Sequence, residues 1–158
     1  MQSRTLRNAL AGRGAHVQPA RVFEGLDWRL VGLRPGGSPH SIWQILGHMI
    51  FWQDFSLAQL RGEDPPVPEH AEESWPKEEA PRDEAEWRRA VERFIAGLDE
   101  AMRLAKGDLT AEIHARPGRT RAESLQMIAA HNSYHAGQVV LLRRMLGAWP
   151  PPGGGDTW

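Results

Sequence analysis

The chain has 158 residues, of which 41% are hydrophobic and 25% charged, values usual for one globular domain. We therefore expect a single domain over residues 1–158. Nineteen basic and 20 acidic residues give a net charge of -1, without the basic excess of nucleic-acid-binding proteins. The absence of cysteine excludes disulfides, thiolate metal ligands and a cysteine nucleophile.

Hydrophobic segments of the kind that target or anchor a protein are not seen in the sequence. No apolar run approaches the roughly 20 residues that span a bilayer. Residues 1–4 are not followed by the apolar stretch of a signal peptide. We therefore expect a cytoplasmic protein that binds neither membranes nor nucleic acid.

The N-terminal part of the chain shows the weakest helical pattern. It predicts two short helices, at about residues 2–11 and 19–27, with a kink at 12–17. Residues 31–40 are rich in Gly and Pro and form a predicted loop.

The second main helix has clear start and stop signals. Ser41 followed by Gln44 fits a capping box, and the apolar pattern continues to about Arg61, before Gly62. Residues 62–82 contain five prolines and form a long irregular connection, which Trp75 is expected to pack against the core.

Two further helices follow this connection. The third begins at Asp83, with Glu86 in the capping-box position, and ends before Gly107. The fourth begins at Thr120, with Glu123 three residues on, and ends at Gly147. We expect Trp149 and Trp158 to hold the C-terminal tail against the bundle.

These patterns predict an all-α fold. No pair of alternating runs predicts a β-hairpin. Long helices with one apolar stripe bury that stripe against one another, so we expect a four-helix bundle with one long connection.

Three histidines are predicted to face the core of this bundle. His131 and His135 are four residues apart on the fourth helix, in line with its apolar residues, and can therefore share one ion. His48 lies on a buried face of the second helix. A shared metal would satisfy all three rings, and imidazole suits zinc, nickel, copper and iron. The alternative is that each ring bonds a backbone carbonyl or water.

The remaining polar residues give no clear catalytic acid or base. Gln44, Trp52 and Gln138 are expected near the three histidines and form a candidate pocket. Asp54 and Tyr134 are predicted to project to other faces of their helices. The four other histidines are expected to be solvated surface residues in loops or caps; they are His16, His40, His70 and His114.

Three stretches resemble the DinB-like superfamily. Residues 39–49 (PHSIWQILGHM) resemble its second-helix motif, and residues 131–138 (HNSYHAGQ) its last-helix motif. Residues 147–152 (GAWPPP) resemble the tail of some members. The likeness extends over nearly the whole chain, in the same order.

The resemblance implies an up-down-down-up bundle with a long crossover after the second main helix. It implies a metal site formed by His48, His131 and His135. We expect one divalent transition metal ion there, with zinc or nickel as the leading candidates. Members include transferases and isomerases that use low-molecular-weight thiols, and proteins described only as metal-dependent hydrolases. We therefore expect a small-molecule substrate, with a non-catalytic metal- or ligand-binding bundle as the alternative. Homodimers are frequent in the family, and the abundant Trp suggests the first two helices as the dimer face.

Overall fold

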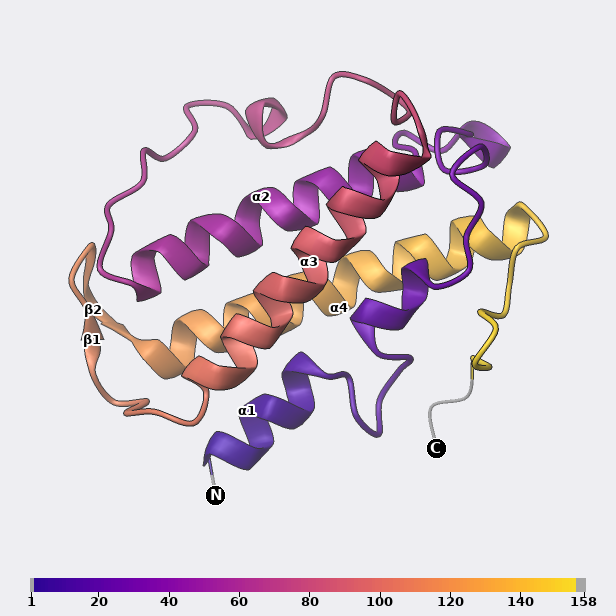
Figure 1. Cartoon of the computed structure of the whole chain (residues 1–158). Coiled ribbons are helices and arrows are strands. Elements are labelled where there is room, and N and C mark those ends of the chain that lie inside the picture. The colour runs from indigo at the N-terminus through magenta and orange to yellow at the C-terminus, as the bar shows by residue number, and fades with distance from the viewer. Residues whose placement is uncertain (1, 156–158) are drawn as a thin grey trace.

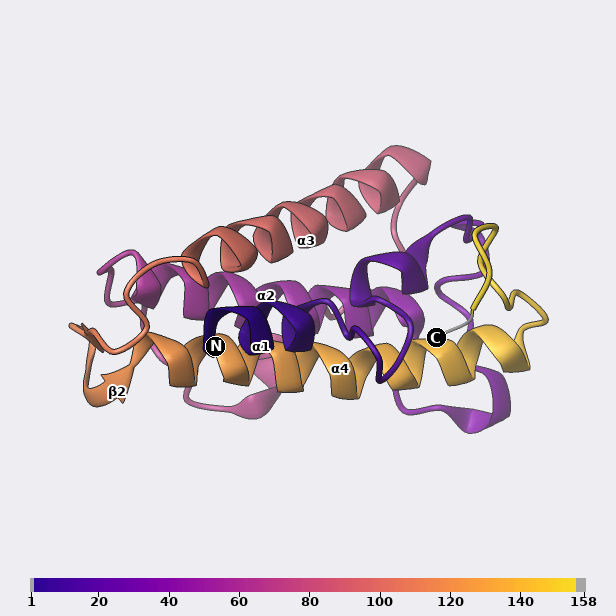
Figure 2. The ribbon, with the colours of Figure 1, turned by 90° about the horizontal axis from the view of Figure 1, so that it is seen from below.

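The computed structural model describes residues 2–155 and has four α-helices. They are α1 (Gln2–Leu10), α2 (Ile42–Leu60), α3 (Glu84–Leu104) and α4 (Arg121–Met145). Helices α1 and α4 run in one direction and α2 and α3 in the other (Figure 1). α3 and α4 lie at opposite edges of the molecule, and α2 packs against both (Figure 2). The predicted up-down-down-up bundle is confirmed.

Local signals set the ends of the two helices that carry the three histidines. At the start of α2, Ser41 Oγ accepts from the Gln44 N–H, and Gln44 Oε1 accepts from the Ser41 N–H. Thr120 and Glu123 form the same reciprocal pair at the start of α4. Beyond the C-terminal ends, Gly62 and Gly147 adopt φ values of 92° and 69°, which glycine tolerates best. These four boundary predictions are confirmed.

The start of α3 differs from the predicted capping box. Asp83 accepts from the Glu86 N–H at 2.7 Å, as expected of an N-cap. The Glu86 carboxylate, however, accepts from the N–H of Arg82 and pairs with the Arg82 guanidinium. Only half of the box forms, because the neighbouring arginine offers Glu86 a charged partner.

The short segments between the helices are 3₁₀ turns. They are η1 (Pro19–Phe23), η2 (Pro35–Gly37) and η3 (Ala71–Ser74). The second short helix, predicted over residues 19–27, is therefore shorter than expected. Gly25 adopts a φ of 64°, a left-handed conformation that an α-helix does not continue through.

The all-α fold class is confirmed, but a small hairpin is present that the sequence analysis did not predict. Strand β1 (Glu112–Ile113) pairs antiparallel with β2 (Arg116–Thr120) between α3 and α4. The register shifts between Glu112 and Ile113. With two residues in one strand and a bulge in the pairing, the hairpin is too short to produce an alternating pattern.

The interior has two apolar clusters separated by buried amides. One cluster includes Phe23, Leu46 and Phe94, and the other includes Leu57 and Leu125. Along α2 the first cluster ends at Ile50 and the second begins at Leu57. Gln53 and Asn132, each 1% exposed, lie between them. The middle of the bundle is therefore polar, and the histidines lie beside this layer.

The C-terminal tail is fixed by one buried arginine. The Arg143 guanidinium donates to the carbonyl oxygens of Val22, Glu24 and Ala148, at 2.7–3.0 Å. It also lies over the ring of Trp149, which packs against the core as predicted. Trp158 lies outside the described residues.

Within residues 2–155, every helix falls short of the combination of length and hydropathy that crossing a lipid bilayer requires.

Candidate metal centre

The three predicted ligands meet in the polar middle of the bundle. His48 comes from α2, and His131 and His135 come from successive turns of α4. Nitrogen atoms of the three rings, one from each, lie within 4.8 Å of one another. The Nε2 atoms of His48 and His131 are 3.2 Å apart. The predicted grouping of these rings is confirmed, and the cluster can hold a metal ion.

The spacing of these two nitrogens tests whether an ion fits. Tetrahedral zinc with bonds of 2.0–2.1 Å separates two ligand nitrogens by about 3.3–3.4 Å. The Nε2 atoms of His48 and His131 are 3.2 Å apart, which is close to this separation. The donor set also fits, since neutral imidazoles suit a transition metal. A nitrogen of His135 lies within 4.8 Å of the nitrogens that the other two rings offer.

Ser74, in the crossover, fixes the tautomer of His48. The Ser74 hydroxyl donates its only proton to the Ala71 carbonyl at 2.7 Å. Its oxygen therefore accepts from His48 Nδ1, 3.0 Å away. With the proton on Nδ1, the Nε2 lone pair of His48 points to the other two rings. This is the arrangement in which metal-binding histidines are usually held by an outer partner.

Gln138 holds His135 in the same way. Its Oε1 lies 2.7 Å from His135 Nδ1, and an amide oxygen can only accept. The proton of His135 is therefore on Nδ1, which leaves the Nε2 lone pair free. Gln138 was predicted near the three histidines, and this hydrogen bond orients the His135 ring.

His131 ends a chain of buried amides. Its Nδ1 is buried without a hydrogen-bond partner, as is Oδ1 of the adjacent Asn132. The Asn132 Nδ2 group donates to Gln53 Oε1, and Gln53 Nε2 donates to the Phe94 carbonyl, each at 2.9 Å. The Asn132 oxygen is thus the acceptor left over for the Nδ1 proton of His131. A hydrogen bond between these two groups would keep the His131 proton on Nδ1 and free its Nε2 as a ligand.

The surroundings keep the three rings neutral. Burial, followed by the charges of His135 and His131, lowers the pKa of His48 to about 4. Burial, followed by the charge of His135, lowers the pKa of His131 to about 4. Burial also lowers the pKa of His135. At neutral pH each ring is therefore uncharged and keeps one nitrogen lone pair, as a metal ligand must.

The crossover covers the cluster with an aromatic stack. The Trp75 ring stacks on His48 at 3.8 Å and, on its other face, on His40 at 3.7 Å. His40 was expected to be a solvated surface residue, and this is wrong, because Trp75 partly buries its ring. Trp75 packs against the core, as predicted.

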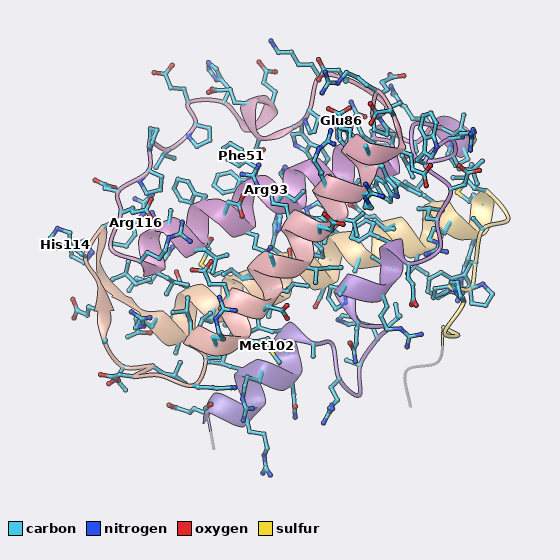
Figure 3. The ribbon with its side chains drawn as sticks, viewed as in Figure 1. Phe51, Glu86, Arg93, Met102, His114 and Arg116 are labelled. Carbon is cyan, nitrogen blue, oxygen red and sulfur yellow. The ribbon has the colours of Figure 1, made fainter. Side chains whose placement is uncertain are left out.

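The other histidines divide between buried and solvated positions. His16 is half-buried and bonds the Val17 carbonyl and the Ser133 hydroxyl, so its predicted solvation is also wrong. His70 and His114 are exposed, as predicted. Figure 3 shows His114 on the hairpin at the edge of the molecule, away from the bundle.

The remaining candidate residues lie in different surroundings. Trp52 and Met127 line a cavity of about 90 Å³ that reaches His131. Gln44 uses its amide to cap α2 and to donate to the Pro76 carbonyl. Asp54 forms an ion pair with Arg93 of α3. Tyr134 is 67% exposed, with its ring 5.0 Å from that of His135.

The comparisons with known proteins agree with this geometry. A family model of the DinB superfamily matches residues 19–139, which is more than half of the chain. The chain belongs to the DinB superfamily. The matched segment contains all three histidines of the cluster. No curated protein and no solved structure matches this DinB-superfamily chain significantly.

Ser74, Gln53 and Asn132 are the site residues that sequence reasoning missed. Ser74 lies among prolines in a segment without periodicity, so no pattern points to it. Asn132 directly follows His131, a predicted ligand on α4. An amide residue next to a ligand could have been predicted to hydrogen-bond the groups that surround the site.

Proposed function

We propose that this chain is a metal-dependent enzyme that acts on a small molecule, as a thiol-dependent transferase or a hydrolase. One divalent transition metal ion, with zinc or nickel as the candidates, would be held by Nε2 of His48, His131 and His135. The membership of the DinB superfamily and the convergence of the three rings support this proposal.

The observation that carries the proposal is the number of ligands. Among the described residues, no Asp, Glu or further His joins the three-histidine group. Structural zinc sites usually have four protein ligands, whereas catalytic sites have three and an open position. A site built from three histidines thus favours catalysis over a purely structural role.

The residues around the ion have separate tasks in this proposal. Ser74 and Gln138 hold two ligand rings with their Nδ1 protons outward. The cavity of about 90 Å³ beside His131 would take part of a small substrate against Trp52 and Met127. When bound, the metal ion supplies a Lewis acid that makes a water or thiol more acidic near neutral pH.

A non-catalytic metal- or ligand-binding bundle is the second candidate. It is favoured by the absence of a carboxylate base from the cluster in the described part of the chain. Asp54, the acidic residue considered on α2, is occupied by Arg93, with their atoms 2.6 Å apart. Under this alternative the ion or ligand would bind without turnover.

Metal content is the first test. Untagged wild-type protein is expected to contain about one equivalent of a transition metal by elemental analysis. A His131→Ala/His135→Ala variant should lose it, whereas the matched His70→Ala/His114→Ala variant, with two exposed histidines changed, should keep it. Wild-type protein that stays metal-free after dialysis against zinc and nickel would reject the proposal.

A second experiment separates an open site from a closed one. Protein loaded with cobalt(II) is titrated with a small thiol and followed by absorption spectroscopy. A new thiolate-to-cobalt charge-transfer band is expected if the transferase proposal is correct. A spectrum that responds to neither thiol nor azide would mean that the fourth position is closed, and would favour the non-catalytic bundle.

A further inference from the structure

Large exposed apolar side chains gather on one face of α4. The described residues include six such side chains, and four of them lie on α4: Met127 (50% exposed), Tyr134 (67%), Leu141 (59%) and Met145 (49%). The other two are Leu33, before η2, and Val67, in the crossover. α1 and α2, which were expected to form a dimer face, carry none of them. An apolar patch of this kind usually marks an interaction surface.

The apolar residues of α4 follow the seven-residue spacing of a helix seam. Met127, Tyr134 and Leu141 are seven residues apart, and Met145 lies one turn beyond Leu141. Residues with this spacing drift by only about 20° per heptad on a straight helix, so they form one nearly axial stripe. Such a stripe packs against a second helix that crosses at a small angle. Tyr and Met are also enriched in protein interfaces.

We propose that this α4 seam (Met127, Tyr134, Leu141 and Met145) is the interface with a second copy of the chain, with the two α4 helices antiparallel and the two-fold axis at Tyr134. Met127 lies seven residues before Tyr134 and Leu141 seven after. The two-fold axis therefore places Met127 of one copy against Leu141 of the other. The same patch serves both copies, as an isologous interface requires.

The charges at the ends of the seam determine the direction. Glu123 lies 11 residues before Tyr134 and Arg144 lies 10 after, and both are exposed. In antiparallel packing, Glu123 of one copy lies beside Arg144 of the other. Their heights along the helix axis differ by one residue, about 1.5 Å. Parallel packing would place Glu123 against Glu123 and Arg144 against Arg144. Opposite charges at the rim favour the antiparallel pair and disfavour the parallel one.

The seam borders the candidate metal centre. Met127 belongs both to the seam and to the wall of the cavity beside His131. His131 follows Met127 by four residues, on the adjoining strip of α4. A second copy on the seam therefore covers one wall of that cavity. The proposed interface does not depend on the metal or on catalysis.

Cross-linking tests both the interface and its direction, because the chain has no native cysteine. With a short bis-maleimide, Tyr134→Cys is expected to give a covalent dimer. Met127→Cys and Leu141→Cys should each stay uncross-linked, because antiparallel packing separates identical positions by about 21 Å. An equimolar mixture of these two variants should cross-link. Val67→Cys is the control, because Val67 is 55% exposed and lies outside the seam.

Other cross-linking patterns would overturn the proposal. Cross-linking of Met127→Cys alone, without extra product in the mixture, would mean parallel helices. Cross-linking of Tyr134→Cys at the level of Val67→Cys would mean that α4 is not the interface.

Sedimentation equilibrium provides the independent measurement. Wild-type protein at tens of micromolar is expected to be dimeric, and Tyr134→Glu or Leu141→Glu to be monomeric with unchanged helical circular dichroism. A monomeric wild type would overturn the proposal. A dimer that survives both substitutions would show that the copies meet at another face.

Discussion

His48 on α2 and Ser74 in the crossover are joined by a hydrogen bond of 3.0 Å between Nδ1 and Oγ. The bond spans 26 residues of sequence, and its direction is fixed because Ser74 donates its own proton to Ala71. An irregular, proline-rich segment thus orients one ring of the candidate metal centre.

Removal of this bond should weaken metal binding. In Ser74→Ala, His48 loses the acceptor that keeps its proton on Nδ1, so its Nε2 lone pair is presented to the ion less often. Outer-contact substitutions of this kind typically lower metal affinity about 10–100-fold. Competition with a chromogenic chelator would measure the change, with circular dichroism to show that the fold is kept.

Ser133→Ala is the matched control for this substitution. Ser133 bonds His16, which lies outside the cluster, at 2.8 Å. Its substitution should leave metal affinity within about twofold of the wild type. Equal losses in the two serine variants would mean that Ser74 has no special role.

The metal-free protein should lose stability as the pH falls from about 6.5 to 4. Burial, followed by mutual repulsion, lowers the pKa of His48 to about 4, and burial with the charge of His135 does the same for His131. Between these values the unfolded chain binds more protons than the folded one, so acid favours unfolding. We expect a loss on the order of 2 kcal/mol, after allowance for partial hydration of the rings.

Urea unfolding at several pH values, with a chelator present, would measure this loss. His48→Gln/His131→Gln removes both titrating rings and should flatten the pH profile in this window. Parallel profiles for the variant and the wild type would contradict the prediction.

Alanine substitutions at two helical glycines should change the stability of the protein in opposite directions. In Gly97→Ala, the new Cβ would overlap the amide of Gln53, which is buried and fixed by hydrogen bonds. We expect a loss of about 1–3 kcal/mol. Gly137 has no neighbour within 4 Å of its Cβ position, so Gly137→Ala should gain about 0.5–1 kcal/mol of helix propensity. Thermal unfolding of both variants would reveal the contrast, and stabilisation by Gly97→Ala would refute it.

Arg143→Lys should be costly although the charge is kept. The guanidinium satisfies three carbonyl oxygens at once, and an ammonium on a flexible stem cannot match that planar geometry. We expect the free energy of unfolding to fall by about 2–3 kcal/mol in urea titrations. Arg144→Lys, at the exposed neighbouring position, should change it by less than about 0.5 kcal/mol. Similar values for the two variants would show that the burial of Arg143 has little energetic effect.

The parts of the fold that depend on neighbouring residues were predictable from the sequence. The capping boxes at Ser41 and Thr120 are local hydrogen-bond patterns, and they set the starts of α2 and α4. The inward direction of His131 and His135 follows from helical periodicity, because both fall in line with buried apolar residues. His48 was found in the same way.

The contacts that orient the histidines depend on parts of the chain that are distant in sequence. Ser74 reaches His48 only because the crossover lies along α2 (Figure 1). Gln53 and Asn132 pair across two helices, 79 residues apart. Neither contact leaves a periodic trace in the sequence. The stacking of His40 on Trp75 was missed for the same reason.

The ligands of the candidate metal centre have a kinetic consequence. His48 and His131 are 83 residues apart, so the complete site exists only after α2 and α4 have docked. If docking completes late in folding, an ion has no complete site in the transition state and cannot lower the barrier to refolding. It must be released, or its coordination broken, before the two helices separate. Metal loading should therefore lengthen the lifetime of the native state while refolding proceeds at the metal-free rate.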